Sequence, residues 1–388
     1  MLQMTRRERL MAILKGEVVD RPAVNFYEIG GFLVNPDDPD GYNIYNSPSW
    51  QPLLKLAENQ TDIIRMVSPV RAQSHLSWNG SSTVDIRKQF VEEKAWEENN
   101  SRFTRLTYKL GTKKLTCLSR RDKDIDTVWT TEPLLKNVDD VNLFLKLPDE
   151  IFEENINTGH MEEQENRLGD SGIVMVDTED PVCAVASLFN LETFTIFALT
   201  EQELCHKLLE KHALYIHKRT EKVAREFPGR LWRIYGPEFI TEPFLPPTLF
   251  DDYVVKYTNP MVKQIKNYGG FVRIHSHGCI KNILDYIINM EADAIDPIEP
   301  PPHGDVELKY VRRKYGKHLV LFGNLEIADI ENMPCDMFRR VVKQTIADGT
   351  SGEGRGFVLM PSASPYGRNI SERTLRNYRI MVEEVERI

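Results

Sequence analysis

Two histidines at the end of an apolar run are the residues best suited to chemistry in this sequence. The run is Phe271-Val-Arg-Ile-His-Ser-His-Gly-Cys279, in which His275 and His277 stand two positions apart and Gly278 ends the pattern. Alternate residues of a strand point to the same face, so both imidazoles would project from one strand end. There they would share a metal ion or bind an anionic substrate. The alternative is that they only close the strand, because two imidazoles do not complete a tetrahedral metal site.

A third candidate ligand follows in the next apolar run. Asp293-Ala-Ile-Asp-Pro-Ile-Glu-Pro-Pro-Pro302 also ends in acids, with Glu299 at its exit. Two successive strand ends would then carry His275, His277 and Glu299. This combination is a ligand set for a divalent metal such as zinc.

The elements that must position these residues predict an α/β fold. Apolar runs alternate with helical stretches, most regularly in the second half of the chain, which is typical of parallel strands with helical crossovers. The number of runs favours a closed (β/α)8 TIM barrel over a doubly wound sheet. The predicted strands are residues 23–29, 62–67, 173–177, 231–235, 271–277, 292–296, 318–322 and 356–360.

Residues 83–130 break this alternation after the second strand. Alternating patterns flank Gly111-Thr112, which predicts an antiparallel hairpin or meander. The segment is too short to form much core of its own. We therefore expect a β-rich insertion within one barrel domain that spans residues 1–388.

In a TIM barrel the active site lies at the carboxyl ends of the strands, and this rule selects further candidates. Many are acidic, and an acidic rim either holds a cation or supplies general acids and bases. Some of these acids would instead cap the following helices. The candidates at the strand ends include Tyr27, Glu28, Asp177, Glu238, Asn324, Ser362, Ser364 and Tyr366.

Composition excludes several other classes of function. A net charge of -9 argues against nucleic-acid binding, because no basic face would offset phosphate repulsion. No window approaches the roughly 18 apolar residues of a membrane span, and the N-terminus has no apolar signal core. The 5 cysteines are odd in number and widely spaced. We expect a cytoplasmic protein without disulfides or a membrane partner.

Motifs spread over nearly the whole chain resemble the uroporphyrinogen decarboxylase superfamily. The opening is similar in Thr5-Arg-Arg-Glu-Arg9 and in Gly16-Glu-Val-Val-Asp-Arg-Pro22. Pro247-Thr-Leu-Phe-Asp251 looks like a helix start of that family. The His275-x-x-Gly278 turn and Leu321-Phe-Gly-Asn324 are also similar. The resemblance implies the same barrel fold.

The resemblance does not extend to porphyrinogen decarboxylation. True decarboxylases carry an arginine-rich segment after the first strand, which grips the carboxylates of the substrate. Residues 25–31 of this chain contain Glu28 and no arginine. A tetracarboxylate substrate would meet a negative charge there instead of cations.

A second branch of the superfamily contains methyltransferases that act with corrinoid proteins. Their zinc is held by a His-x-Cys pair and a later cysteine, and related methionine synthases add a glutamate. His275 matches the histidine, His277 replaces the first cysteine, and Glu299 falls where the glutamate would be. Ser362 or Ser364 stands at the late cysteine.

A ligand set without thiolates makes the metal a harder and stronger Lewis acid. It suits an oxygen-bound methyl donor, a methoxy aromatic or methanol, better than a thiol acceptor. The resemblance thus implies a zinc-assisted O-demethylase component that passes the methyl group to a corrinoid protein. In this interpretation Glu238, His277 and Tyr366 act in catalysis, Asn324 and Ser362 contact the cofactor, and Tyr27, Glu28 and Asp177 bind the donor.

Two other interpretations stay open. One is a lyase, for example a decarboxylase, that acts on a small carboxylate with His275, His277 and rim acids, with or without a metal. The other is a non-catalytic protein that binds a porphyrinoid or corrinoid. A homodimer is compatible with each of them.

Overall fold

Parallel strands form the centre of the molecule. The computed structural model describes residues 3–69, 84–154 and 156–388. Its 8-stranded sheet has the order β1-β12-β11-β10-β9-β8-β7-β2, and every pairing in it is parallel. The strands are β1 (Ala23–Val24), β2 (Ile63–Val67), β7 (Gly172–Glu179), β8 (Leu231–Tyr235), β9 (Phe271–His275), β10 (Ala294–Asp296), β11 (Val320–Leu325) and β12 (Phe357–Pro361).

The sheet curls so that its two outer strands meet. The backbone N–H of Asp62, just before β2, donates to the carbonyl of Val24 in β1 at 2.8 Å. This contact joins the two ends of the strand order. The predicted α/β fold of the TIM-barrel type is therefore confirmed, and each of the predicted apolar runs overlaps one of these strands.

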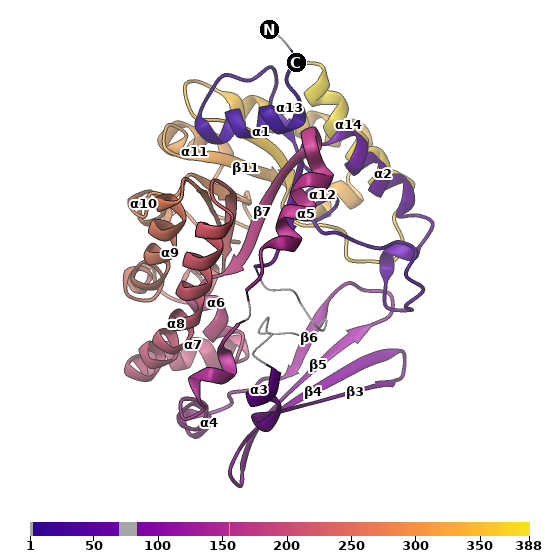
Figure 1. Cartoon of the computed structure of the whole chain (residues 1–388). Coiled ribbons are helices and arrows are strands. Elements are labelled where there is room, and N and C mark those ends of the chain that lie inside the picture. The colour runs from indigo at the N-terminus through magenta and orange to yellow at the C-terminus, as the bar shows by residue number, and fades with distance from the viewer. Residues whose placement is uncertain (1–2, 70–83, 155) are drawn as a thin grey trace.

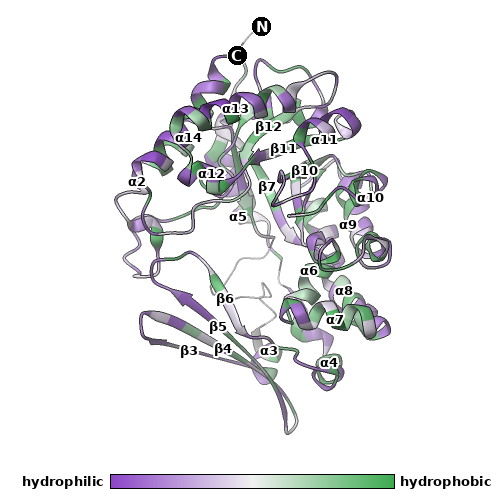
Figure 2. Cartoon of the chain, turned by 180° about the vertical axis from the view of Figure 1, so that it is seen from behind, coloured by the Kyte–Doolittle hydropathy of each residue, from purple (hydrophilic) through white to green (hydrophobic). Residues whose placement is uncertain are grey.

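Helices surround the curled sheet (Figure 1). In Figure 2 strand β12 is largely hydrophobic, whereas the helices mix hydrophobic and hydrophilic residues, as amphipathic helices on a barrel do. The α-helices are α1 (Arg6–Lys15), α2 (Gln51–Gln60), α3 (Val84–Phe90), α4 (Val138–Phe144), α5 (Gly159–Leu168), α6 (Pro181–Ala186), α7 (Leu191–Thr200), α8 (Gln202–Glu226), α9 (Lys256–Asn267), α10 (Leu284–Asn289), α11 (Leu308–Tyr315), α12 (Ile327–Asn332), α13 (Cys335–Thr350) and α14 (Glu372–Glu386). Short helical turns are η1 (Ile44–Asn46), η2 (Asp149–Phe152), η3 (Gly169–Ser171), η4 (Pro237–Ile240), η5 (Pro247–Leu249) and η6 (Asp251–Val255).

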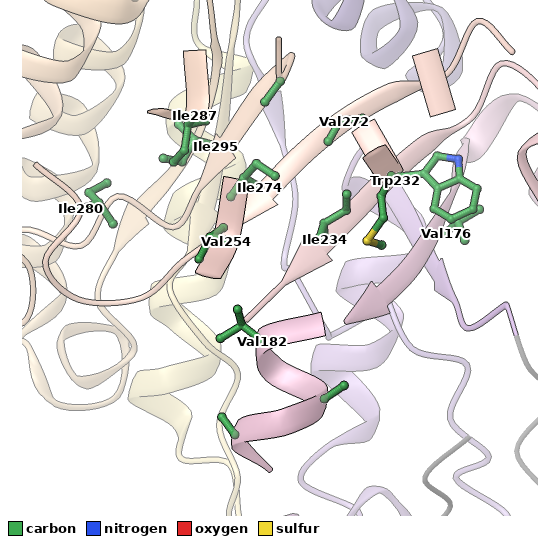
Figure 3. Close-up of a cluster of buried hydrophobic side chains, with 14 of the residues drawn as sticks. Val176, Val182, Trp232, Ile234, Val254, Val272, Ile274, Ile280, Ile287 and Ile295 are labelled. Carbon is green, nitrogen blue, oxygen red and sulfur yellow. The ribbon is translucent and has the colours of Figure 1, made fainter. Parts of the chain in front are cut away.

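The strands present apolar residues to the helices, whereas their face toward the barrel interior mixes apolar residues with buried arginines. Figure 3 shows the outward set, in which Trp232 and Ile234 of β8 and Val272 and Ile274 of β9 form one buried cluster. The residues between them in sequence, such as Arg233 and Arg273, therefore point to the opposite face. Both arginines are buried. The interior beneath the strand ends is thus charged.

The first strand is shorter than predicted. Residues 23–29 were expected to be extended, but β1 ends at Val24. After it the chain turns, with Ile29 N–H donating to the carbonyl of Phe26 at 3.1 Å. Tyr27 has a φ of 58°. This turn directs the side chain of Tyr27 to the barrel interior, where it packs with Met66 and Phe322 in a second apolar cluster.

The predicted insertion is a second, antiparallel sheet. Its order is β3-β4-β5-β6, with β3 (Val91–Glu98), β4 (Ser101–Leu110), β5 (Lys113–Asp122) and β6 (Val128–Glu132). The hairpin at Gly111-Thr112 is confirmed, since Leu110 pairs with Lys113. Residue 83, the predicted start of the insertion, lies outside the described residues. Leu106 and Leu115 are buried in the main apolar cluster, and Figure 1 places this sheet beyond the carboxyl ends of the barrel strands.

An ion pair near the N-terminus makes stability depend on pH. Arg9 binds Asp20 through Nε and Nη2, each at 2.7 Å, and these hydrogen bonds lower the pKa of Asp20 to about 2. Because the pKa is below its ordinary value, the pair stabilises the fold above about pH 4 and this contribution is lost as the pH falls toward 2. We expect Asp20→Asn to lower the free energy of unfolding by about 2 kcal/mol at neutral pH and by much less near pH 2.5.

Urea unfolding at both pH values measures this difference. Asp37→Asn at an exposed loop position is the matched control, and it should leave the free energy of unfolding nearly unchanged. An equal loss at both pH values for Asp20→Asn would contradict the assignment.

Candidate functional site

The two predicted histidines meet carboxylates from the neighbouring strand. His275 ends β9 and is paired in register with Asp296 at the end of β10. The Nδ1–H of His275 donates to Asp296 Oδ2 at 2.8 Å, and Arg273 Nε lies 3.0 Å from the other oxygen, Oδ1. Burial alone would raise the pKa of Asp296, but Arg273 and His275 more than offset this and hold it at about 2. Asp296 is therefore an anion that orients the imidazole.

His277 has its own carboxylate partner. Its Nδ1–H donates to Glu299 Oε1 at 2.8 Å, while the backbone N–H of Gly278 donates to Glu299 Oε2 at 2.7 Å. The rings of His275 and His277 are 4.6 Å apart between centroids and perpendicular, with an interplanar angle of 90°. The strand geometry thus brings both imidazoles together, as predicted.

The pKa values of the two imidazoles are shifted in opposite directions. Burial lowers the pKa of His275, and Asp296 offsets this only in part. Burial also acts on His277, but Glu299 and the more distant Glu238 outweigh it and raise its pKa. The two imidazoles are therefore not equivalent, although each is bound by a carboxylate.

Each histidine leaves one nitrogen for a ligand. Because both Nδ1 atoms are taken by carboxylates, His275 and His277 have Nε2 available. A carboxylate behind the imidazole is the usual arrangement of a metal-bound histidine, so the pair fits two metal ligands. Within the described ranges, however, no group of three or more His, Cys, Asp and Glu side chains is arranged to hold a metal ion. Glu299 lies beside Nδ1 of His277, so the predicted metal set stays a prediction.

Two residues predicted to bind the donor are joined by an arginine. Arg233 of β8 binds Asp177 Oδ1 of β7 through Nε at 2.6 Å, and its Nη1 donates to the hydroxyl of Tyr27. The Tyr27 ring stacks on His275, with centroids 6.0 Å apart and an interplanar angle of 19°. Burial raises the pKa of Tyr27 far above its usual range. Tyr27 and Asp177 therefore form part of the same site, in a layer fixed by Arg233.

Two further predicted acids, Glu28 and Glu238, lie near these residues. Glu28 follows Tyr27, and its burial raises its pKa. Glu238 lies in η4, after β8, where its Oε2 accepts the backbone N–H of Gly236 at 3.2 Å. Since Glu238 acts electrostatically on His277, it belongs to the rim around the histidines.

The remaining candidates divide into buried and peripheral residues. Asn324 of β11 donates from Nδ2 to the carbonyl of Ile298 at 3.0 Å. Ser362, just after β12, donates from Oγ to Glu326 Oε2 at 3.2 Å. Both are buried, as is Ser364. Tyr366 is 59% exposed and reaches the insertion through its backbone carbonyl, which accepts the N–H of Asp126 at 2.8 Å, so the structure does not bring its ring to the histidines.

Three residues of this site were not among the candidates predicted from the sequence. Arg233 and Arg273 interrupt apolar runs at positions that share a strand face with Tyr235 and His275, a signal that the sequence contains. His303 follows three prolines in a loop and shows no local pattern. Its Nδ1–H donates to Glu326 Oε2 at 3.0 Å, and only the fold brings these residues together.

Comparison with known proteins identifies the family. The family model for uroporphyrinogen decarboxylase (URO-D) matches residues 164–387, so the chain belongs to this family. The assignment made from the short motifs is thereby confirmed. No curated protein matches the sequence.

Two solved structures are similar to this chain. The first, a methyltransferase from Methanosarcina mazei, has a TM-score of 0.58 and 13% sequence identity, and the match covers 99% of each chain. At this identity the likeness shows a shared fold. The second, a D-psicose 3-epimerase from Clostridium cellulolyticum H10, has a TM-score of 0.35 and 10% identity, and the match covers 58% of this chain and 83% of that one.

In the described part of the chain, no helix has the length and apolar character needed to cross a membrane.

Proposed function

We propose that this protein is a methyltransferase that moves a methyl group from an oxygen-bound donor to a corrinoid carried by a partner protein. The observation that supports this most is the pair of histidines at the end of β9, each bound by a carboxylate from the end of β10 or just after it, with both Nε2 atoms available. Membership of the URO-D family and the fold shared with a methyltransferase are consistent with it. The donor would be a methoxy aromatic or methanol.

The difficult part of this reaction is the departure of oxygen. The reduced corrinoid supplies the electron pair for the new bond to the methyl carbon, and the broken carbon–oxygen bond leaves its pair on oxygen. An alkoxide or phenoxide is a poor leaving group, so the site must stabilise this charge or protonate it. A divalent metal, zinc in the simplest case, would be held by His275 and His277 through Nε2, with Glu299 as a third ligand or as the orienting carboxylate, and would supply Lewis acidity.

The chain's own groups position the donor. Asp296 and Glu299 fix the two imidazole rings, so their free nitrogens point in constant directions. Tyr27, held by Arg233 and stacked on His275, offers an aromatic surface next to them. Glu238 is a candidate proton donor for the leaving oxygen. Because the antiparallel sheet lies beyond the strand ends, the corrinoid protein would approach past that sheet (Figure 1).

The second candidate function is a lyase that acts on a small carboxylate. The observation that favours it is the opposite shift of the two histidine pKa values. An imidazole with a lowered pKa whose ring centroid lies 4.6 Å from that of one with a raised pKa suits the base and the acid of a proton-transfer reaction.

A methyl-transfer assay tests the proposal. The purified protein is incubated with reduced cobalamin and methoxy aromatics, methanol, methylamines or thioethers, and the absorbance of methylcobalamin is followed. We expect transfer from oxygen-bound donors and none when the donor is omitted. Transfer only from amines or thioethers would exclude the oxygen-donor assignment. No transfer from any donor, with the native corrinoid protein present, would favour the lyase.

A further inference from the structure

A third histidine–carboxylate pair lies on the same rim, where the loop after β10 meets the end of β11. His303 Nδ1–H donates to Glu326 Oε2 at 3.0 Å, and Ser362 Oγ donates to the same oxygen at 3.2 Å. Ser362 in turn accepts the backbone N–H of Ile327 at 3.3 Å. Glu326 is therefore held between a loop and the ends of β11 and β12.

The two side chains of this pair differ in their exposure to solvent. The His303 side chain is 53% exposed, whereas that of Glu326 is 11% exposed. The second carboxyl oxygen, Glu326 Oε1, is buried and has no hydrogen-bond partner among the residues that the structure describes. A buried, unpartnered oxygen of this kind is costly unless it carries a proton or meets a ligand.

The charges around the pair favour a proton on it. Burial raises the pKa of Glu326 and the carboxylate of Glu299 adds to this rise, while the hydrogen bonds from His303 and Ser362 offset it only in part. Glu326 itself raises the pKa of His303, with smaller contributions from Glu299 and Asp329. The surroundings thus raise the pKa of both members of the pair.

We propose that Glu326 is the acid that protonates the leaving oxygen of the methyl donor, and that His303 restores this proton from solvent. This inference rests on the proposed methyl transfer. Glu238 is the competing acid, and its Oε2 accepts the N–H of Gly236 at 3.2 Å. Glu326 differs in that its Oε2 accepts the Nδ1–H of the exposed His303, while its buried Oε1 has no hydrogen-bond partner among the described residues.

The proton and electron balance is simple. The carbon–oxygen bond breaks and its electron pair stays on oxygen, while the pair of the reduced corrinoid forms the bond to the methyl carbon. The oxygen takes the proton of Glu326 and leaves as an alcohol or phenol, and Glu326 is left as a carboxylate. Solvent protonates Nε2 of the half-exposed His303, and the resulting imidazolium gives its Nδ1 proton to Glu326 and returns to neutral imidazole.

The leaving-group dependence of Glu326→Gln tests the role of the acid. Donors with electron-withdrawing ring substituents leave as stable phenoxides and need little protonation, whereas electron-rich methoxy aromatics and methanol need it most. We expect the variant to be about 100-fold slower with the poor leaving groups and nearly unchanged with the best ones. A structural defect would slow all donors by the same factor. Glu307→Gln, an exposed carboxylate before α11, is the matched control.

His303→Ala tests the proton supply. We expect a lower kcat with an unchanged KM, and partial recovery when imidazole is added, because the vacated position is open to solvent. His318→Ala is the control, since His318 is exposed at the opposite end of β11.

Each outcome decides the inference. An equal slowing of all donors by Glu326→Gln, or no slowing, would overturn it while wild-type methyl transfer stands. A steeper leaving-group dependence in Glu238→Gln alone would assign the acid to Glu238 instead. Absence of methyl transfer by the wild type would overturn both the inference and the proposed function.

Discussion

Replacing His275 with alanine is expected to lower kcat/KM for methyl transfer by at least about 100-fold. His275 is buried at the end of β9, between Tyr27 and His277, with its Nδ1 bound to Asp296. The substitution removes one of the two available Nε2 atoms. Methyl transfer and zinc content are the two measurements, with His318→Ala as the control for loss of a surface histidine.

A milder variant tests the carboxylate that orients His275 without removing the imidazole itself. Asp296→Asn keeps the His275 ring but weakens the acceptor that orients it, so we expect a loss of about 10- to 100-fold in metal affinity. Thermal unfolding of both variants checks that the fold is retained. If wild-type protein takes up no zinc when zinc is supplied, the metal assignment fails, and the histidines would then hydrogen-bond the substrate. Full activity of His275→Ala would exclude this site altogether.

Replacing Asp62 with alanine is expected to lower the free energy of unfolding by about 3–5 kcal/mol. Asp62 is fully buried next to β2 and binds three donors. Its Oδ1 accepts Arg9 Nη1 at 2.5 Å, and its Oδ2 accepts Arg21 Nη1 and the backbone N–H of Val24, each at 2.9 Å. The variant leaves the buried guanidinium of Arg9 with one partner fewer at the point where β1 meets β2.

Urea unfolding measures this loss. The control is Glu58→Gln, because Glu58 pairs with Arg65 at 3.3 Å but is 57% exposed, and such pairs contribute roughly 0–1 kcal/mol. If Asp62→Ala does not fold, Asp62→Asn, which keeps one acceptor oxygen, gives a measurable intermediate value. A change for Asp62→Ala as small as that of the control would show that the contact between β1 and β2 does not depend on this carboxylate.

The position of the histidines on the barrel could be predicted because it depends on local patterns. Apolar runs, their alternation with helices and the two-residue period of a strand are properties of neighbouring residues. They placed His275 and His277 together at a strand end, and the pattern around Gly111-Thr112 predicted the hairpin. The capping box of α1, in which Thr5 and Glu8 bind each other's backbone N–H, is local for the same reason.

The partners of the site residues were decided by the tertiary structure. Parallel register pairs His275 with Asp296 across two strands, and a loop brings His303 to Glu326, 23 positions away in sequence. Tyr366 follows a strand end, as the other candidates do, yet the contact of its backbone with the insertion leaves its ring exposed. The sequence by itself therefore determined which strand ends carry chemical groups, because strand periodicity is local. Which group binds which, and in what charge state, was decided only by strand register and burial, because both depend on residues far apart in the chain.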